Sequence, residues 1–464
     1  MSSAFLVKKE LRFKELNDLV TSGRTRRESW RRTQLSRVEE ILEDHESEIL
    51  QALKCDLGKP SNEAIIEIIA LKQELKLAKR KLRQWMKSKH VELPLPLQPG
   101  IAKLNLEPLG CILIIGPWNY PFSLTIQPLI SALAAGNTVV IKPSEHAPNT
   151  SKLIADVFSH KFPKDVLQVC EGDGVIASEL IEYPFDHIFF TGGSTVGQKV
   201  LTAAAKNLTP VTLELGGQSP AIVLEGADLE VTARRLIWGK GLNAGQTCLA
   251  PNHVLVEDSI KTKLIEELKK ALRDFYGNQP IQSPDLAKIV NKHHFSRLQK
   301  LLEDSQKTNQ VIAGGDFDKE KLLISPTIIE VANDNDPLLK DELFGPLLPI
   351  LTFSDFTKVL NQIKKGASPL AIYMFGGSQE KQEKLIAKTR SGGICFNDVI
   401  MQAGIPDMPF GGVGLSGMGR YHGFAGFETF SNKRSILKRP FFLDFKLRYP
   451  PYKLSTSILK NLLS

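Results

Sequence analysis

The sequence has few cysteines, no long hydrophobic run and no large excess of charge of one sign. Its five cysteines are odd in number, widely spaced and form no CxxC pair: Cys55, Cys111, Cys170, Cys248 and Cys395. This pattern excludes a disulfide framework and a zinc site, and it is typical of a reducing, cytoplasmic compartment. No stretch reaches the length of a membrane-spanning helix, and residues 1–9 lack the hydrophobic region of a signal peptide.

The basic and acidic residues nearly balance, with 59 of the former, 51 of the latter and a net charge of +8. They are interleaved along the chain, without a basic–aromatic ladder, so we expect no nucleic-acid partner. The pair His293–His294 has no ligand-spaced neighbour, so we expect no metal. With 464 residues, 42% hydrophobic and 24% charged, the chain has the composition of a globular protein with two or three domains.

Three kinds of segment follow one another in the first half of the chain. Residues 1–90 are charged and helical, and within 71–89 apolar residues recur at helical spacing. Prolines make 93–97 a non-helical connector into an alternating strand at 101–106. Short apolar strands then alternate with helices, which predicts a parallel sheet with ligands beyond the carboxyl ends of its strands. The strands are expected at 111–115, 138–141, 167–170 and 187–190, and the helices at 124–135, 151–158, 175–181 and 196–206.

A second α/β region runs from about 211 to 392. Its strands are expected at 221–224, 253–256, 346–353 and 370–375, and its helices at 228–242, 260–275 and 295–303. A glycine-rich segment at 409–419 and a strand-like arm at 427–440 follow. For the tail, 453–464, a docked or frayed terminus is favoured over contact with a membrane surface.

Three residues have the chemistry of a nucleophile, a base and an oxyanion donor. Cys248 lies among small and turn-forming residues, where a sulfur stays accessible, although free cysteines are mostly inert. Glu214 lies between apolar residues and a double glycine, where burial suits a general base; a capping or ion-paired glutamate is the alternative. Asn119 follows the first strand and either donates to an oxyanion or holds its own turn.

Other motifs are compatible with a nucleotide but weak one by one. Gly192 and Gly193 follow a strand and open a helix, which suits a phosphate or a plain turn. Lys142 also ends a strand, where it can hold ribose hydroxyls or remain solvated. Glu342 precedes a glycine–proline turn and can accept bonds from a ribose.

The motifs GPWNYPF (116–122), KPSE (142–145), FTGGSTVG (190–197), LELGG (213–217), GQTCLAP (245–251), ELFGP (342–346), PFGGVGLSGMG (409–419) and YHG (421–423) occur in this order. Together they resemble the NAD(P)-dependent aldehyde dehydrogenase superfamily over residues 10–452, and within it the class 3 and fatty aldehyde branch. The resemblance implies a Rossmann-type cofactor domain (1–210, with 396–426 returning to it), an α/β catalytic domain (211–395), a β-arm for oligomerisation (95–108 and 427–452) and a homodimer.

The resemblance also implies residue roles. Cys248 matches the nucleophile, Glu214 the general base and Asn119 the oxyanion donor. Residues that match the NAD or NADP site are Trp118, Lys142, Glu145, Gly192, Gly193, Ser194, Val196, Gly197, Leu215, Glu342 and Phe344.

The implied reaction is the oxidation of hydrophobic aldehydes, medium- or long-chain aliphatic or aromatic, to carboxylic acids. Gln402 departs from the branch, which often has histidine there, so substrate preference stays open. An acylating enzyme that uses coenzyme A is disfavoured by Glu214, and a cysteine hydrolase by the absence of a histidine context near Cys248. An inactive binding protein with this fold is the third alternative.

Overall fold

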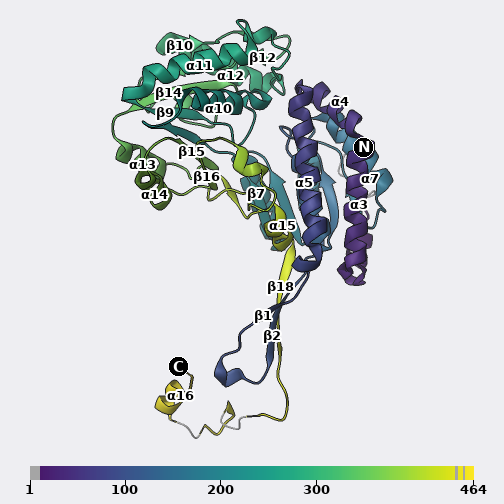
Figure 1. Ribbon diagram of the computed structural model, residues 1–464. Helices are drawn as coiled ribbons and strands as arrows, with labels where there is room; N and C mark the ends of the chain where they lie inside the picture. The colour runs from purple at the N-terminus through teal and green to yellow at the C-terminus, as the bar shows by residue number, and fades with distance from the viewer. Residues whose placement is uncertain (1–10, 445–447, 453–454, 464) are drawn as a thin grey trace.

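The structure is a computed structural model that describes residues 11–444, 448–452 and 455–463. Two main sheets with their helices form the body, and a narrow three-stranded sheet extends from it toward the C-terminal helix (Figure 1). The predicted α/β class is confirmed. Across the described ranges, no helix has both the length and the apolar character needed to cross a membrane. The interpretation of residues 1–9 lies outside the described residues, as do parts of the tail.

The N-terminal helices pack beside the first sheet (Figure 1). They are α2 (Phe13–Thr21), α3 (Glu28–Asp44), α4 (Glu46–Leu57) and α5 (Ser61–Trp85). The apolar stripe of α5 is buried as expected for a helix that faces a core, with Leu71, Leu75 and Leu82 almost fully covered. The helix expected over 71–89 ends earlier, at Trp85, and Lys89 already belongs to a strand.

The first sheet has six strands in the order β17-β7-β6-β3-β4-β5. They are β3 (Cys111–Ile115), β4 (Thr138–Lys142), β5 (Leu167–Val169), β6 (His187–Thr191), β7 (Val211–Glu214) and β17 (Gly417–Met418). All are parallel except β17, which pairs antiparallel with β7. The connecting helices are α6 (Ser123–Ala135), α7 (Pro148–Lys161), α8 (Gly174–Ile181) and α9 (Ser194–Ala204). The predicted strands and helices are confirmed here, with ends that shift by a few residues.

The second sheet has seven strands in the order β10-β13-β14-β9-β8-β15-β16. They are β8 (Pro220–Val223), β9 (His253–Glu257), β10 (Gln310–Ala313), β13 (Thr327–Glu330), β14 (Leu347–Phe353), β15 (Ala371–Phe375) and β16 (Gly393–Phe396), with a small hairpin of β11 (Phe317–Asp318) and β12 (Leu323–Ile324). Its helices are α10 (Leu229–Gly241), α11 (Lys261–Tyr276), α12 (Lys292–Thr308), α13 (Phe356–Lys365) and α14 (Gln379–Lys388).

The change of sheet does not fall after residue 210, where the sequence placed a boundary. Strand β7 pairs in parallel with β6 and so still belongs to the first sheet. The chain passes to the second sheet between Glu214 and Pro220, and β17 later brings it back. Glu214 therefore ends the last parallel strand of one sheet and faces the junction with the other.

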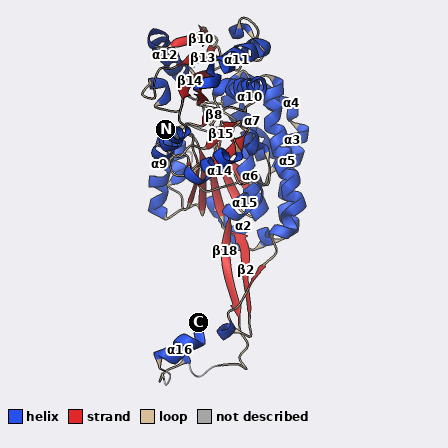
Figure 2. Cartoon of the chain, turned by 60° about the vertical axis from the view of Figure 1, so that its left-hand side comes forward, coloured by secondary structure: helices blue, strands red, loops and turns tan. Residues whose placement is uncertain are grey.

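The arm consists of β1 (Lys89–Val91), β2 (Ile101–Pro108) and β18 (Ser431–Lys438), with β2 in the middle (Figure 2). Strands β2 and β18 pair antiparallel from Pro108↔Ser431 to Ile101↔Lys438. The C-terminal helix α16 (Thr456–Leu463) lies near the far end of this arm (Figure 1).

Two expectations for the arm were wrong in detail. The strand predicted from 427 starts only at Ser431, because 427–429 complete helix α15 (Gly423–Thr429) and Phe427 and Phe430 are buried in the core. The connector 93–97 contains one short 3-10 turn, Leu95–Leu97. A proline is tolerated there because the first residues of a helix need no N–H donor.

Candidate functional site

A cavity of about 1130 Å³ lies where the carboxyl ends of β3, β4, β6 and β7 meet the second sheet's loops. The residues after each of these strands line it, together with Cys248 and the segment around Glu342. This is where a parallel sheet is expected to bind a ligand.

The cavity brings together all but two of the residues that the resemblance assigns to the catalytic and cofactor sites. Its lining includes Cys248, Glu214, Asn119, Trp118, Lys142, Glu145, Gly192, Gly193, Val196, Leu215, Glu342 and Phe344. Ser194 turns its hydroxyl toward the carbonyl of Leu415, and Gly197 packs against Leu215, so neither forms part of the lining.

Cys248 follows a tight left-handed segment of the chain. Asn243, Ala244 and Gly245 have φ angles of 52°, 52° and 71°, which lets the backbone turn sharply before the cysteine. Cys248 is partly exposed to the cavity. Burial, with the nearby carboxylates of Glu342 and Glu214, raises the pKa of its thiol to about 12. The thiolate of Cys248 is therefore disfavoured here, because its surroundings are apolar and negative.

Glu214 is the last residue of β7 and is 4% exposed. Neither of its carboxylate oxygens has a hydrogen-bond partner within the described chain. Burial raises its pKa well above the usual value, and the charge of Arg420 opposes this only in part. A Cβ on Gly411 would come within 2.9 Å of a carboxylate oxygen, so a glycine allows the 409–419 loop to pack on this group. The carboxyl group is thus confined and still free to accept a proton.

Asn119 is held between the first strand and the cysteine loop. The side-chain Nδ2 of Asn119 donates to the backbone carbonyl of Gln246 at 3.1 Å, and the backbone carbonyl of Asn119 accepts from Nδ2 of Asn243 at 2.9 Å. A side-chain amide has two N–H groups, so one remains for a ligand in the cavity.

The opposite end of the cavity has the features of a nucleotide site. Gly193 is the N-cap of helix α9, and apart from its neighbours in the chain no described atom lies within 4 Å of the place where a Cβ would stand on it. No described side chain caps the helix, so its first backbone N–H groups are available to an anion. A Cβ on Gly192 would come within 2.6 Å of the Phe190 ring. Nearby, Lys142 and Glu145 form an ion pair at 2.5 Å.

Glu342 lies directly on the turn that follows β7. A Cβ on Gly216 would come within 2.0 Å of its Oε2, and the backbone N–H of Gly217 donates to the carboxylate. Burial raises the pKa of Glu342 to about 7.

Lys240 is a buried residue that the sequence did not indicate. Burial lowers the pKa of Lys240 to about 7, although the carboxylate of Glu342 favours its charged form.

One face of α12 was also missed. His294, Arg297, Leu301 and Asp304 recur at helical spacing and line the cavity, while the neighbouring face of the helix is buried in the core. The His294 ring lies 5.2 Å from that of Trp118. The periodicity of α12 does indicate a polar face, but a local pattern does not say what that face borders.

Comparisons with known proteins agree on one family. The aldehyde dehydrogenase family model matches residues 22–436. The 4,4'-diaponeurosporen-aldehyde dehydrogenase of Staphylococcus aureus is 41% identical over 96% of both chains. A dog protein named "aldehyde dehydrogenase, dimeric NADP-preferring" is 41% identical over 93% of this chain and 95% of its own. A structure of the substrate-bound state of Staphylococcus aureus AldH matches with a TM-score of 0.93, 39% identity and coverage of 97% and 98%.

The cavity and its cysteine, glutamates and glycine turn are therefore found on a chain that matches one family over nearly its whole length. The predicted aldehyde-dehydrogenase-like fold and NAD(P) dependence are confirmed. The chain belongs to the aldehyde dehydrogenase family, whose members oxidise aldehydes to carboxylic acids with NAD or NADP.

Proposed function

We propose that Cys248 is the nucleophile, Glu214 the general base and Asn119 the oxyanion donor of this aldehyde dehydrogenase, and that its substrates are hydrophobic aldehydes. The observation that carries the proposal is that all three side chains line one cavity, with Glu214 unpartnered among the described groups. A buried polar group without a partner is costly, and its retention supports a chemical role.

The other residues of the cavity fit a dinucleotide. The free N–H groups at the start of α9 suit the pyrophosphate, Lys142 and Glu145 the adenosine ribose, and Glu342 the nicotinamide ribose. The first sheet with its helices, including β7 up to Glu214 and the returning β17, would form the cofactor domain, and the second sheet with its helices the catalytic domain. When bound, the nicotinamide supplies the hydride acceptor.

The chain's own groups perform the remaining steps. The Cys248 thiol gives up its proton to solvent in the cavity, and its sulfur bonds to the aldehyde carbon as the carbonyl π bond breaks. The resulting oxyanion is stabilised by the Cys248 backbone N–H and by Nδ2 of Asn119. Loss of hydride leaves an acyl thioester on Cys248. Glu214 then takes a proton from water, which attacks the thioester and releases the carboxylate and the thiol. Because burial raises the pKa of Glu214, the carboxylate is a stronger base than an exposed glutamate.

The surroundings of Cys248 support a hydrophobic substrate. The cavity that Cys248 lines also has apolar side chains in its wall, among them Leu370 and Phe410. The Staphylococcus aureus relative is named for 4,4'-diaponeurosporen-aldehyde. Gln402, whose Nε2 lies 3.5 Å from the hydroxyl of Tyr373, is the polar residue expected to modulate the preference.

The test is a stopped-flow trace of NAD(P)H formation with decanal, for the wild type and for Cys248→Ala, run with NAD⁺ and then with NADP⁺. A signal in the wild type alone supports the nucleophile and ranks the two cofactors. An equal signal in both proteins would remove Cys248 from its role. If decanal gives no signal but benzaldehyde does, the aliphatic assignment is wrong and the aromatic one holds.

We also propose that the protein is a homodimer that forms through the arm, and that it is cytoplasmic. In the arm, β18 is an edge strand with exposed Leu437, and an exposed edge is ready to pair with another chain. The name of the dog relative includes the word dimeric. The cytoplasmic assignment rests on the sequence, whose five cysteines are odd in number, widely spaced and without a CxxC pair, a pattern that suits a reducing compartment.

A further inference from the structure

Helix α5 presents three glutamates to the interior of the protein. Glu63, Glu67 and Glu74 are separated by four and seven residues, which puts them on one face of the helix. Glu67 and Glu74 are 2% and 1% exposed, and Glu63 is half-buried. Carboxylates on a core-facing stripe are costly unless they are hydrogen-bonded, so the partners of these three need an explanation.

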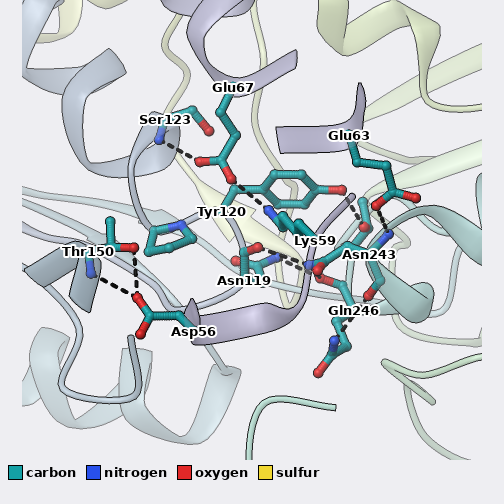
Figure 3. Close-up of polar contacts among 12 residues, drawn as sticks. Asp56, Lys59, Glu63, Glu67, Asn119, Tyr120, Ser123, Thr150, Asn243 and Gln246 are labelled. Atoms are coloured by element: carbon teal, nitrogen blue, oxygen red, sulfur yellow. Dashed lines mark hydrogen bonds and ion pairs between the residues drawn. The ribbon is translucent and has the colours of Figure 1, made fainter. Parts of the chain in front are cut away.

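Each glutamate accepts a backbone N–H from a different loop. Asn243 donates to Glu63, Ser123 to Glu67 and Gly423 to Glu74, each at 2.8 Å. Figure 3 shows the first two of these bonds, which lie on either side of Tyr120. One rigid helix therefore contacts three segments that are far apart in the sequence.

All three loops border the cavity. Asn243 begins the left-handed segment before Cys248, and Ser123 begins α6 just after Asn119. Gly423 begins α15 directly after the pair Tyr421–His422, and Tyr421 lines the cavity close enough to Glu214 for that charge to raise its pKa.

The first two loops are also bonded to each other. Nδ2 of Asn243 donates to the carbonyl of Asn119, and the hydroxyls of Tyr120 and Thr247 are 2.7 Å apart (Figure 3). The left-handed turn that starts at Asn243 is an unfavourable conformation that neighbouring contacts must maintain. The Glu63 bond holds the first residue of that turn.

The charges of the three glutamates are balanced differently. Glu67 forms an ion pair of 2.6 Å with Lys59, both side chains being 1% exposed, and Lys59 also lies 3.8 Å from the centre of the Tyr120 ring (Figure 3). Glu63 and Glu74 form no ion pair with the described residues, and burial raises the pKa of each to about 7. Glu63 and Glu74 can thus act as neutral acceptors, which a glutamine also provides, whereas Glu67 needs its charge opposite Lys59.

We propose that Glu63, Glu67 and Glu74 are positioning residues. Through a single helix they fix three loops relative to one another: the loop of Cys248, the loop of Asn119 and the Tyr421–Gly423 loop beside Glu214. The proposal rests on the roles given above to those three residues. It assigns Glu63 and Glu67 to acylation, the steps that form the thioester on Cys248. It assigns Glu74 to deacylation, the step in which water hydrolyses that thioester. A role in folding alone would not separate the two halves.

The first test compares Glu63→Leu, Glu63→Gln and the matched control Gln73→Leu at an exposed position of the same helix. We expect Glu63→Leu to slow the NAD(P)H burst with decanal by roughly a hundredfold, because small misplacements of reacting groups have effects of this size. The KM for NAD⁺ should stay unchanged. Glu63→Gln should restore the burst, and Gln73→Leu should match the wild type. A wild-type burst in a folded Glu63→Leu would overturn the proposal.

The second test concerns Glu74, whose loop lies by the base. Glu74→Leu should keep the burst and reduce the steady turnover rate by roughly tenfold or more, because a displaced general base loses part of its contribution to that rate. Glu74→Gln should recover the turnover. Equal losses in the burst and in the steady rate would contradict the division between the halves.

A third test remains valid if leucine variants do not fold. Glu67→Gln leaves Lys59 buried without its partner, and the burst should slow. Lys59→Met with Glu67→Gln removes both charges but keeps the acceptor for Ser123, and the burst should return. A double variant as slow as the single variant would contradict the role of Glu67 as an acceptor, and a single variant as fast as the wild type would contradict the need for its charge opposite Lys59.

One readout separates this proposal from the proposed function. Alkylation of Cys248 by iodoacetamide, followed by peptide mass spectrometry, needs no turnover. If Glu63→Leu loosens the loop, water reaches the thiol and alkylation should accelerate severalfold over Gln73→Leu. If Glu63→Leu accelerates alkylation but the wild type oxidises no aldehyde, the positioning is supported and the proposed function is contradicted. If the wild type is active but Glu63→Leu leaves alkylation unchanged, the proposed function is supported and the positioning is contradicted.

Discussion

At the scale of single residues, the cavity is defined by carboxyl groups that burial keeps from ionising easily. Glu214 and Glu342 both have raised pKa values, and both raise the pKa of the Cys248 thiol. These surroundings favour the thiol of Cys248 over its thiolate. A positive charge placed near Cys248 would favour its thiolate, so the reactivity of the sulfur depends on what the cavity binds.

Replacement of the base should divide the reaction. In Glu214→Gln we expect the first burst of NAD(P)H to persist and steady turnover to fall by roughly a hundredfold or more, because acylation needs the thiol and deacylation needs the base. Stopped-flow traces under excess aldehyde measure both phases. Steady turnover at the wild-type rate would remove Glu214 from its role.

The same substitution should change the pH dependence of stability. The folded-state pKa of Glu214 lies above its unfolded value, so its favourable contribution is complete below the unfolded pKa and is lost as pH rises through the folded pKa. Glutamine does not ionise, so the stability gain of Glu214→Gln should be larger at about pH 8 than at about pH 5.

Thermal unfolding at the two pH values measures this difference. Glu380→Gln, at an exposed position of α14, is the control and should show no such trend. A gain for Glu214→Gln that shrinks with rising pH would contradict the direction of the pKa shift. A stabilised, inactive variant would also show that the base is maintained at the expense of stability.

At the scale of elements, α5 and α15 form the part of the body from which the arm departs. Phe427 of α15 is fully buried, with its ring 5.5 Å from that of Trp85 at the end of α5. Strand β18 leaves directly after this contact, beginning at Ser431. The aromatic contact thus fixes both the Gly423 loop and the root of the arm.

Removal of that ring should be costly. We expect Phe427→Ala to lower the free energy of unfolding by about 3–5 kcal/mol, because a fully buried phenylalanine leaves a cavity when it is truncated. Denaturant unfolding is the measurement. The control is Phe442→Ala at a side chain 83% exposed, for which little change is expected. A loss for Phe427→Ala no larger than that of the control would mean that this contact does not hold α15 to α5.

At the scale of the whole molecule, the two sheets form the cavity between them, and the arm reaches away from both (Figure 2). The arm carries exposed apolar residues along and beyond its strands, among them Ile101, Leu437 and Phe441. Exposed apolar surface of this kind marks an interaction site. A second copy of the chain is the occupant we propose.

The proposed dimer should have twice the chain mass of 51.5 kDa. We expect Leu437→Asp to shift it toward the monomer in sedimentation, because a charge on the paired edge would have to be buried. Ile386→Asp, on the exposed side of α14, should leave the dimer intact. Wild-type protein that sediments as a monomer would contradict the assembly.

The sequence by itself determined the type and order of most elements. Apolar runs such as 111–115 and 187–190 became buried parallel strands, because strands covered on both faces read as continuous hydrophobic stretches. The motifs with Cys248, Glu214 and Asn119 were found by their order along the chain, and the cavity brings them together.

Only the tertiary structure decided which surfaces meet. It assigned β7 to the first sheet, completed α15 at Thr429 and turned one face of α12 toward the cavity. It also gave Glu63, Glu67 and Glu74 their loop partners, where the sequence showed only a charged helix. The physical reason is range: periodicity and propensity act over a few neighbouring residues, whereas the contacts of these glutamates join segments 56 to 349 residues apart and depend on the packing of the whole chain.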